Sequence, residues 1–371
     1  MTYANDFEKL SSEQKIGQLF FIGLPGTVID EQTSDLLEKI SPGGICLFSR
    51  NIKEAAATRK LLDNTREILP IEPFLAIDQE GGLVDRLRRI ITPMPSIKKL
   101  AENGNTDYIE KIAALTAEIL RILGFNMNFA PVVDVIDELR EKFVNGLYSR
   151  GFGNSKEDVV NLAGKYLDTL QTGGCLATIK HFPGYGATEV DSHEELPQVN
   201  LSLDELFDKD LIPYQRFIAE KEISAVMIGH AAYPKIDLQE TDTDGKILPS
   251  SLSYNFVTKL LREELNYQNL VLTDDLEMGA IVKNYGMGEA AKMAIKAGND
   301  QLLICANVSA INEAFDAVCQ AVKSGEISSK RIDESLGRIK KIKSKLSPPL
   351  EFDEQKIEEI SLKVKELSEL C

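Results

Sequence analysis

The feature that most constrains the fold is an eightfold alternation of short apolar segments with longer amphipathic ones. The apolar segments are residues 18–24, 43–49, 74–80, 125–135, 177–184, 224–231, 270–277 and 300–306. The stretches between them carry apolar residues at intervals of three and four, which is typical of helices. They include 52–69, 107–123, 156–172, 203–221, 252–265 and 288–297. Regular alternation of strand and helix predicts an α/β fold with a parallel sheet, and eight such units close a (β/α)8 TIM-type barrel. A doubly wound open sheet is the alternative, and the lack of a Gly-x-Gly-x-x-Gly motif after the first segment disfavours it.

Three further helical patterns follow the eighth apolar segment, at 309–323, 328–346 and 352–370. The prolines of the sequence SPPL at 347–350 separate the last two, because proline ends or breaks a helix. We find no linker long enough to separate two domains. The sequence therefore predicts a single catalytic barrel domain over residues 1–371, with a C-terminal helical appendage from 328 to 371.

The charge and cysteine content exclude several classes of partner. A formal charge of −16 argues against a nucleic-acid partner, because phosphate binding requires clustered lysine and arginine. No apolar stretch approaches the roughly 20 residues that span a bilayer, and the N-terminus lacks the pattern of a signal peptide. The cysteines are widely spaced, without a C-x-x-C pair, which favours a reducing compartment. We expect a cytoplasmic monomer without a membrane span. The cysteines are Cys46, Cys175, Cys305, Cys319 and Cys371.

Polar residues gather where the apolar segments end, and in a barrel these ends form the mouth that carries the chemistry. Asp78 lies near the end of the third segment, Lys180 and His181 lie in the fifth, and Asp274 lies near the end of the seventh. All three histidines, His181, His193 and His230, occupy such positions or the loops that follow them. The sequence therefore predicts an active site at the C-terminal ends of the strands.

Structural roles are the alternative for some of these residues. Asp78 is a turn former next to two glycines, and His230 after an apolar strand is as compatible with a hydrogen-bonded core histidine as with a ligand. Asp275 suits the start of a following helix. Asp191 and His193 lie in a glycine-rich loop, where titratable side chains contribute little to a core, so a functional role is favoured there.

Strand geometry separates Asp274 from Asp275. Successive side chains point to opposite faces, so we expect only one of the two to face the mouth. Leu270 and Leu272 share the phase of Asp274, whereas Val271 and Thr273 share that of Asp275. Periodicity alone leaves open which phase is internal.

The residue types at the predicted mouth favour glycosyl transfer. The histidines lack metal-binding spacing, and the chain contains no H-E-x-x-H, G-x-S-x-G or Walker A motif. A carboxylate can attack an anomeric carbon while a second group protonates the leaving oxygen. A histidine with a pKa of about 6.5 suits the second role, and Asp191 beside His193 can orient its ring. Side chains that suit the binding of sugar hydroxyls are Asp78, Arg86, Arg150, Lys180 and His181.

Several motifs together resemble glycoside hydrolase family 3. They are KHFPGYGATEVDSHEELP, AIDQEGG, GGICLFSRN, NFAPVVDV, SRGFG, GHAAYP and LTDDLEMGAI, and the resemblance covers about residues 10 to 340. Within the family, the chain is most similar to the β-N-acetylglucosaminidase (β-hexosaminidase) clade that trims glucosamine residues from peptidoglycan fragments.

The resemblance implies a retaining hydrolase on a (β/α)8 barrel that needs no metal or organic cofactor. It implies that Asp274 is the nucleophile, His193 the general acid/base and Asp191 its partner. It also implies that the sugar at the non-reducing end is held by Asp78, Arg86, Arg150, Lys180 and His181. We add His230 as a binding candidate from its position at the end of the sixth strand.

The chain departs from the family pattern at three places. Tyr185 and Ala187 stand where P-G-H-G-D-T is common, Leu83 replaces a frequent arginine, and residues 137–148 form a long stretch before Arg150. These changes bear on substrate length and preference more than on the catalytic set.

The sequence therefore predicts a retaining β-N-acetylglucosaminidase that acts on a carbohydrate, with muropeptides as the expected source. Phosphorolysis and β-glucosidase or β-xylosidase activity at the same site are alternatives. A Schiff-base lyase that uses Lys180 and a non-catalytic sugar-binding protein are alternatives of other classes.

Overall fold

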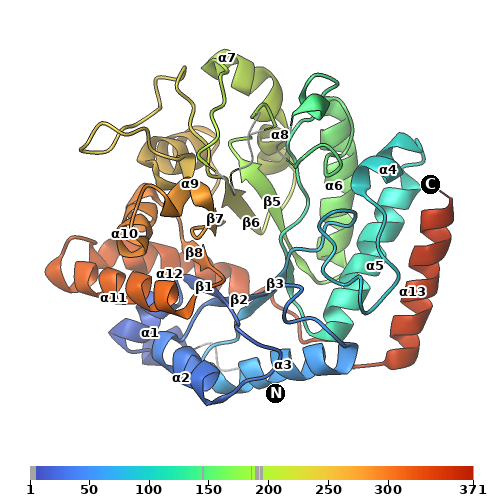
Figure 1. Cartoon of the computed structure of the whole chain (residues 1–371), viewed down its shortest axis with the longest axis horizontal. Coiled ribbons are helices and arrows are strands. Elements are labelled where there is room, and N and C mark those ends of the chain that lie inside the picture. The colour runs from blue at the N-terminus through green and yellow to red at the C-terminus, as the bar shows by residue number, and fades with distance from the viewer. Residues whose placement is uncertain (1–5, 144–145, 185, 189–191, 193–194, 371) are drawn as a thin grey trace.

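The computed structural model describes residues 6–143, 146–184, 186–188, 192 and 195–370. Its centre is a closed barrel of eight parallel strands that pair in chain order, with β8 returning to β1 (Figure 1). The strands are β1 (Phe20–Gly23), β2 (Gly44–Leu47), β3 (Phe74–Ile77), β4 (Met127–Asn128), β5 (Leu176–Phe182), β6 (Ala225–Ile228), β7 (Leu270–Asp275) and β8 (Gln301–Ile304). Each coincides with one of the eight predicted apolar segments, although β5 begins one residue before its segment, so the predicted barrel is confirmed.

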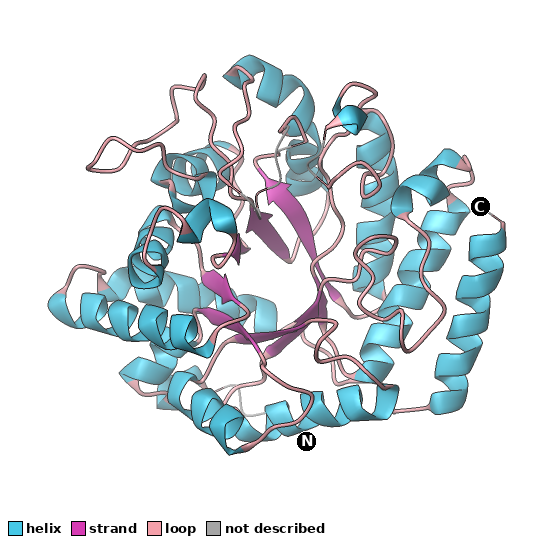
Figure 2. Ribbon diagram, in the orientation of Figure 1, coloured by secondary structure: helices cyan, strands magenta, loops and turns pink. Residues whose placement is uncertain are grey.

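Helices surround the barrel on its outside (Figure 2). The α-helices are α1 (Ser12–Gly17), α2 (Glu31–Ile40), α3 (Ala55–Ile68), α4 (Ile97–Glu102), α5 (Asp107–Leu123), α6 (Lys156–Thr172), α7 (Leu203–Glu205), α8 (Ile212–Glu220), α9 (Gly279–Val282), α10 (Met287–Ala297), α11 (Val308–Ser324), α12 (Ser329–Lys343) and α13 (Glu354–Glu369). Short 3-10 helices are η1 (Phe7–Lys9), η2 (Arg140–Lys142) and η4 (Ser250–Leu252), and π-helices are η3 (Leu206–Asp210) and η5 (Asn255–Glu264).

One predicted helix is less regular than its apolar spacing indicates. The pattern at 203–221 is divided among α7, the π-helix η3 and α8, and Pro213 lies at the start of α8. Proline lacks the backbone donor that continues a helix, which explains a new start at this point. None of the described helices combines the length and the apolarity that crossing a bilayer requires.

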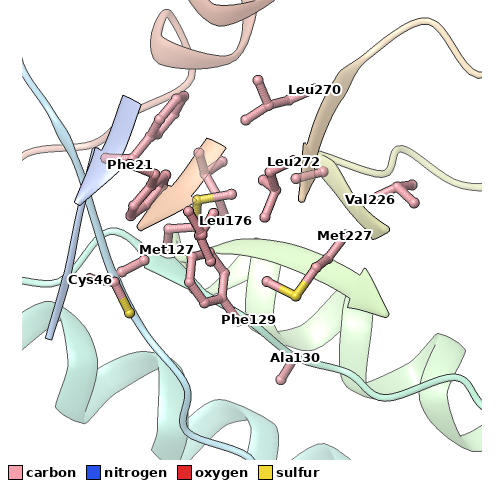
Figure 3. Close-up of a cluster of buried hydrophobic side chains, with 14 of the residues drawn as sticks. Phe21, Cys46, Met127, Phe129, Ala130, Leu176, Val226, Met227, Leu270 and Leu272 are labelled. Atoms are coloured by element: carbon pink, nitrogen blue, oxygen red, sulfur yellow. The ribbon is translucent and has the colours of Figure 1, made fainter. Parts of the chain in front are cut away.

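Apolar side chains fill the interior of the barrel. Phe21, Met127, Leu176, Leu270 and Leu272 come from four strands and meet in its centre (Figure 3). Such packing makes the barrel a solid core, so that open space remains only beyond the strand ends. The phase of Leu270 and Leu272 is therefore the internal one, and it continues towards Asp274.

A lysine from α12 closes the opposite end of the barrel. Lys343 is 1% exposed, its Nζ donates to Oε1 of Gln18 (2.8 Å), and the ammonium lies 5.3 Å from the ring centre of Phe74. Burial lowers its pKa to about 7, and Glu72 only partly offsets this effect. The barrel floor therefore depends on a residue that follows the last strand.

Replacement of Lys343 by methionine is expected to remove a pH dependence of stability. In the unfolded chain Lys343 titrates near 10.5, whereas in the folded protein it titrates near 7. Between these values the unfolded state binds the proton more tightly, so the lysine destabilises the fold as the pH falls towards 7. When the pH is lowered from about 10 to about 7, the free energy of unfolding of the wild type should fall by about 2–4 kcal/mol more than that of the variant. Urea unfolding at both pH values measures this, with the exposed Lys341→Met as the control; equal pH slopes in wild type and variant would contradict it.

Candidate active site

A cavity of about 330 Å³ opens at the C-terminal ends of the strands. Six residues predicted from the sequence line it together, and they come from β5, β7 and the loops after β3 and β4. These residues are Asp78, Arg86, Arg150, Lys180, His181 and Asp274. The structure thus brings together side chains that lie far apart in the sequence.

A network of alternating charges forms one wall of this cavity. Lys180 Nζ lies 2.5 Å from Asp78 Oδ1 and 2.6 Å from Glu80 Oε1. Glu80 also accepts two hydrogen bonds from Arg150, at 2.7 and 2.8 Å, and Arg86 Nη2 lies 3.4 Å from Asp78. Fixed bidentate contacts of this kind hold the donors in place before a ligand arrives.

The network keeps its members ionised. Burial alone would raise the pKa of Asp78, but Lys180, Arg86 and Arg150 outweigh it and lower that pKa to about 2. Burial would lower the pKa of Lys180, but Asp78 and Glu80 outweigh it and raise the pKa above its usual value. A permanently protonated ammonium is not an amine nucleophile, so this geometry disfavours the Schiff-base alternative.

Asp274 lies at the end of β7 and lines the cavity. Its Oδ1 accepts a hydrogen bond from the backbone N–H of Asp275 (2.8 Å). Burial would raise its pKa, but the attraction of His181, His230 and Lys180 prevails and lowers it. The carboxylate is therefore ionised at neutral pH, which is the form that can act as a nucleophile.

The expectation that only one of the two aspartates faces the mouth is wrong. Both Asp274 and Asp275 line the cavity. The register between β7 and β8 shifts between Leu272 and Asp275, and a bulge of this kind redirects a side chain that regular alternation would turn away. The structure thus adds a second carboxyl group to the cavity wall.

Replacement of Asp275 by asparagine is expected to change the pH profile near neutrality. Burial raises the pKa of Asp275 to about 7, and the charges of Glu277 and Asp274 add to this rise. The group is neutral below this pH and gains a negative charge above it. We expect the pH profile of kcat/KM for Asp275→Asn to lose one ionisation near pH 7, in addition to the one that the general acid/base contributes, and kcat/KM at pH 5 to change by less than about tenfold. A profile measured from about pH 5 to 9 tests this, with Glu277→Gln as a control; a profile of Asp275→Asn with the same ionisations as the wild type would contradict the assignment.

The two described histidines have different surroundings. His181 lines the cavity, and its Nδ1 lies 2.7 Å from Oδ2 of Asp134, which fixes the ring. His230 is fully buried, and it is absent from the cavity lining. Its Nδ1 shares a hydrogen bond with Ser251 Oγ (2.7 Å), and its Nε2 donates to the carbonyl of Asp275 (3.0 Å). His230 therefore lies behind the Asp274–Asp275 backbone, where it resembles the core histidine considered above.

The predicted pair Asp191 and His193 lies outside the described residues. Ser192, which separates them in the sequence, is described and is 2% exposed. Its carbonyl accepts a hydrogen bond from the backbone N–H of Ala280 (3.2 Å) at the start of α9, next to the cavity-lining Gly279. The loop is thus attached at the edge of the cavity between the two predicted residues.

Several residues in or next to the cavity were missed by the sequence analysis. Glu80 lies within the quoted motif AIDQEGG, but its role as a partner of Arg150 and Lys180 depends on contacts with distant segments. Phe48, Phe129 and Met227 supply apolar surface to the cavity, at apolar positions that the sequence does not distinguish from ordinary barrel core. Among the described residues, no cluster of three or more His, Cys, Asp or Glu side chains has the arrangement of a metal site.

A closed (β/α)8 barrel with an ionised strand-end carboxylate and a charged cluster at its mouth fits the class of barrel glycoside hydrolases. The model of the glycosyl hydrolase family 3 N terminal domain matches residues 11–342, so the chain belongs to glycoside hydrolase family 3. The predicted family is confirmed.

Known relatives agree with this assignment. A beta-hexosaminidase of Pseudomonas aeruginosa is 34% identical over 307 residues, which cover 81% of this chain and 86% of the relative. Beta-hexosaminidase A of Pseudoalteromonas piscicida is 30% identical over 340 residues, which cover 86% of this chain but only 56% of the relative. Some relatives are therefore much longer than the region they share with this chain.

Solved structures show the same fold. A family 3 beta-N-acetylglucosaminidase from a Paenibacillus strain superposes with a TM-score of 0.86 and 35% identity, over 97% of this chain and 69% of that one. A family 3 glycosyl hydrolase from Mycobacterium smegmatis gives a TM-score of 0.80 and 31% identity, over 92% of this chain and 99% of that one.

Proposed function

We propose that this protein is a retaining β-N-acetylglucosaminidase that removes terminal, non-reducing, β-linked N-acetylglucosamine. The observation that carries the proposal is the ionised Asp274 in the same cavity as the network of Asp78, Lys180, Glu80 and Arg150. Family membership and the beta-hexosaminidase names of its relatives support the choice of sugar.

The charged wall suits the binding of sugar hydroxyls. Ionised Asp78 accepts hydrogen bonds, whereas Lys180 and the arginines donate them. The Nε atom of Arg86 is buried and has no hydrogen-bond partner within the described part of the chain, although buried donors are nearly always paired. A sugar hydroxyl would satisfy it. Because Asp134 fixes His181 through Nδ1, Nε2 is the atom through which this ring can contact the sugar.

The reaction follows from two displacements. Asp274 attacks the anomeric carbon to form a glycosyl-aspartate while a general acid protonates the leaving oxygen. The same group then removes a proton from water, which attacks the anomeric carbon and frees Asp274. We assign this group to His193, with Asp191 as its partner, and the attachment of Ser192 beside Gly279 supports the assignment.

We further propose that the substrates are peptidoglycan fragments in the cytoplasm, with N-acetylglucosamine attached to an anhydro-muramic acid. Incubation with purified muropeptides and with neutral chitin oligosaccharides, followed by quantification of released sugar, distinguishes the sources. Faster release from the chitin oligosaccharides would contradict this part of the proposal, but the assignment of the sugar would remain unchanged.

A panel of aryl β-glycosides tests the sugar and the reaction type. We expect kcat/KM for the N-acetylglucosaminide to exceed that for the glucoside and the xyloside by at least about a hundredfold, because a site built for a polar group rejects analogues that lack it. The same reaction in phosphate buffer tests whether water or phosphate accepts the sugar. Formation of a sugar 1-phosphate in place of the free sugar would identify a phosphorylase and contradict hydrolysis.

A further inference from the structure

Arg140 and Asp210 form a buried ion pair outside the cavity. Arg140 Nη1 donates to Asp210 Oδ1 (2.6 Å) and Nη2 donates to Oδ2 (2.9 Å), so that two parallel hydrogen bonds join the groups. The side chains are 7% and 0% exposed. Removal of two charges from water is costly, and only good geometry with additional hydrogen bonds repays it. Arg140 supplies one such bond from Nη1 to the carbonyl of Val135 (2.7 Å).

The backbone that follows His181 lies directly against this ion pair. A Cβ atom on Gly184 would lie 2.8 Å from the Cβ of Asp210, and the positive φ of 106° at Gly184 also favours glycine. A Cβ atom on Gly186 would lie 2.6 Å from the carbonyl oxygen of Val135. Arg140 thus hydrogen-bonds to both groups against which these glycines pack. They are the side chain of Asp210, next to Gly184, and the carbonyl of Val135, next to Gly186.

The same contacts continue into the sugar-binding wall. The N–H of Val133 donates to the carbonyl of Lys180 (2.7 Å), and Asp134 accepts from both the backbone N–H and Nδ1 of His181. Asp210 is the last residue of the π-helix η3, and π-helices occur frequently at functional sites. The ion pair therefore joins η2, in the long loop after β4, to η3, against which the segment that leaves β5 packs at Gly184.

We propose that Arg140 and Asp210 are positioning residues. They hold Gly184 and Gly186, at the start of the loop that carries Asp191 and His193 in the sequence, in a fixed position relative to the cavity. The inference rests on the proposed function, because it requires the loop after Gly186 to supply the acid/base group. Neither side chain lines the cavity. The pair therefore acts on proton transfer to the leaving oxygen and leaves sugar binding largely unchanged.

Leaving-group dependence separates this role from a purely structural one. A poor leaving group requires protonation in the transition state, whereas a highly acidic phenol departs without it. For Asp210→Asn we expect kcat/KM, which reports the first displacement, to fall about 10- to 100-fold with a weakly acidic phenol and less than about threefold with dinitrophenol. Because the second displacement still needs the base, kcat with dinitrophenol should fall even though kcat/KM does not. Arg140→Lys, which keeps a positive charge beside Asp210, should lose less of kcat/KM with the weakly acidic phenol.

The chain offers a matched control. Arg262 and Asp300 form an ion pair with the same exposure, 7% and 0%, and a separation of 2.7 Å. Asp300 directly precedes β8, at the end of the barrel away from the cavity. Asp300→Asn should lower thermal stability, and the ratio of its kcat/KM to that of the wild type should be the same for every leaving group. A similar leaving-group dependence in Asp300→Asn would overturn the inference.

A double variant keeps the test valid if Asp210→Asn folds poorly. Replacement of a buried ion pair by apolar residues often preserves stability, so Arg140→Met with Asp210→Leu should fold. We expect the leaving-group dependence to persist in this folded variant, because the bond to Val135 is lost. Full activity with all leaving groups would overturn the inference.

His193→Ala distinguishes failure of the inference from failure of the proposed function. It should show the strongest leaving-group dependence. If His193→Ala shows it and both Asp210 variants do not, the positioning role is wrong and the proposed acid/base assignment stands. If His193→Ala shows none, the acid/base assignment is wrong and the inference falls with it.

Discussion

Replacement of Asp274 by alanine is expected to lower kcat on an aryl β-N-acetylglucosaminide by about 10⁴- to 10⁶-fold, the range found when a nucleophile is removed from an enzyme. The lowered pKa of Asp274 keeps it ionised, and no other group at the end of β7 is held in this form, since Asp275 has a raised pKa. Steady-state kinetics at neutral pH measure the loss.

Azide distinguishes loss of the nucleophile from loss of folding. In the alanine variant a small anion can enter the space of the missing carboxylate and attack the anomeric carbon. One displacement in place of two inverts the configuration, so the product should be the α-glycosyl azide. Asp275→Asn is the control and should neither lose activity to this extent nor respond to azide. Activity of Asp274→Ala near the wild-type level without azide would contradict the assignment.

Replacement of Lys180 by methionine is expected to weaken both the enzyme and its fold. The substitution leaves Asp78 and Glu80 without the ammonium that lies within 2.6 Å of both. Loss of one partner from a buried charged network costs about 3–5 kcal/mol in the free energy of unfolding. Loss of a charged hydrogen-bond donor to the sugar should lower kcat/KM at least about a hundredfold.

The same variant should also become sensitive to acid. Lys180 is the strongest of the charges that lower the pKa of Asp78, so that pKa should rise when the ammonium is removed. In the wild type Asp78 is ionised above about pH 2, whereas in the variant protonation of Asp78 should reduce kcat/KM at a higher pH. Lys343→Met is the control, because it removes another buried lysine at the other end of the barrel. An acid limb of kcat/KM at the same pH in Lys180→Met and wild type would contradict this role of Lys180.

The fold was predictable because it depends on local patterns. Apolar segments of strand length alternate with amphipathic helices, and the barrel follows from their number and order. The positions of Asp78, Lys180 and Asp274 followed from the same argument, since strand ends converge at one mouth. The motifs of the family resemblance also predicted Arg86, Arg150 and His181, which the structure places in the cavity lining.

The remaining features depend on contacts between distant segments or on irregular backbone. A bulge brings Asp275 into the cavity although alternation turns it away. Glu80 and Arg150, like Arg140 and Asp210, are 70 residues apart, and no local pattern links them. His230 occupied a predicted mouth position, yet its partners Ser251 and Asp275 place it behind the cavity wall.

The lysine that closes the barrel floor has a consequence for biosynthesis. Ribosomes release β8 before α12, so a nascent chain has all eight strands before Lys343 emerges to reach Gln18. Until then the contact of Lys343 with the ring of Phe74 at this end of the barrel is missing. Completion of the native state during translation therefore awaits the C-terminal helices, and a ribosome stalled just after β8 should carry a protease-sensitive intermediate.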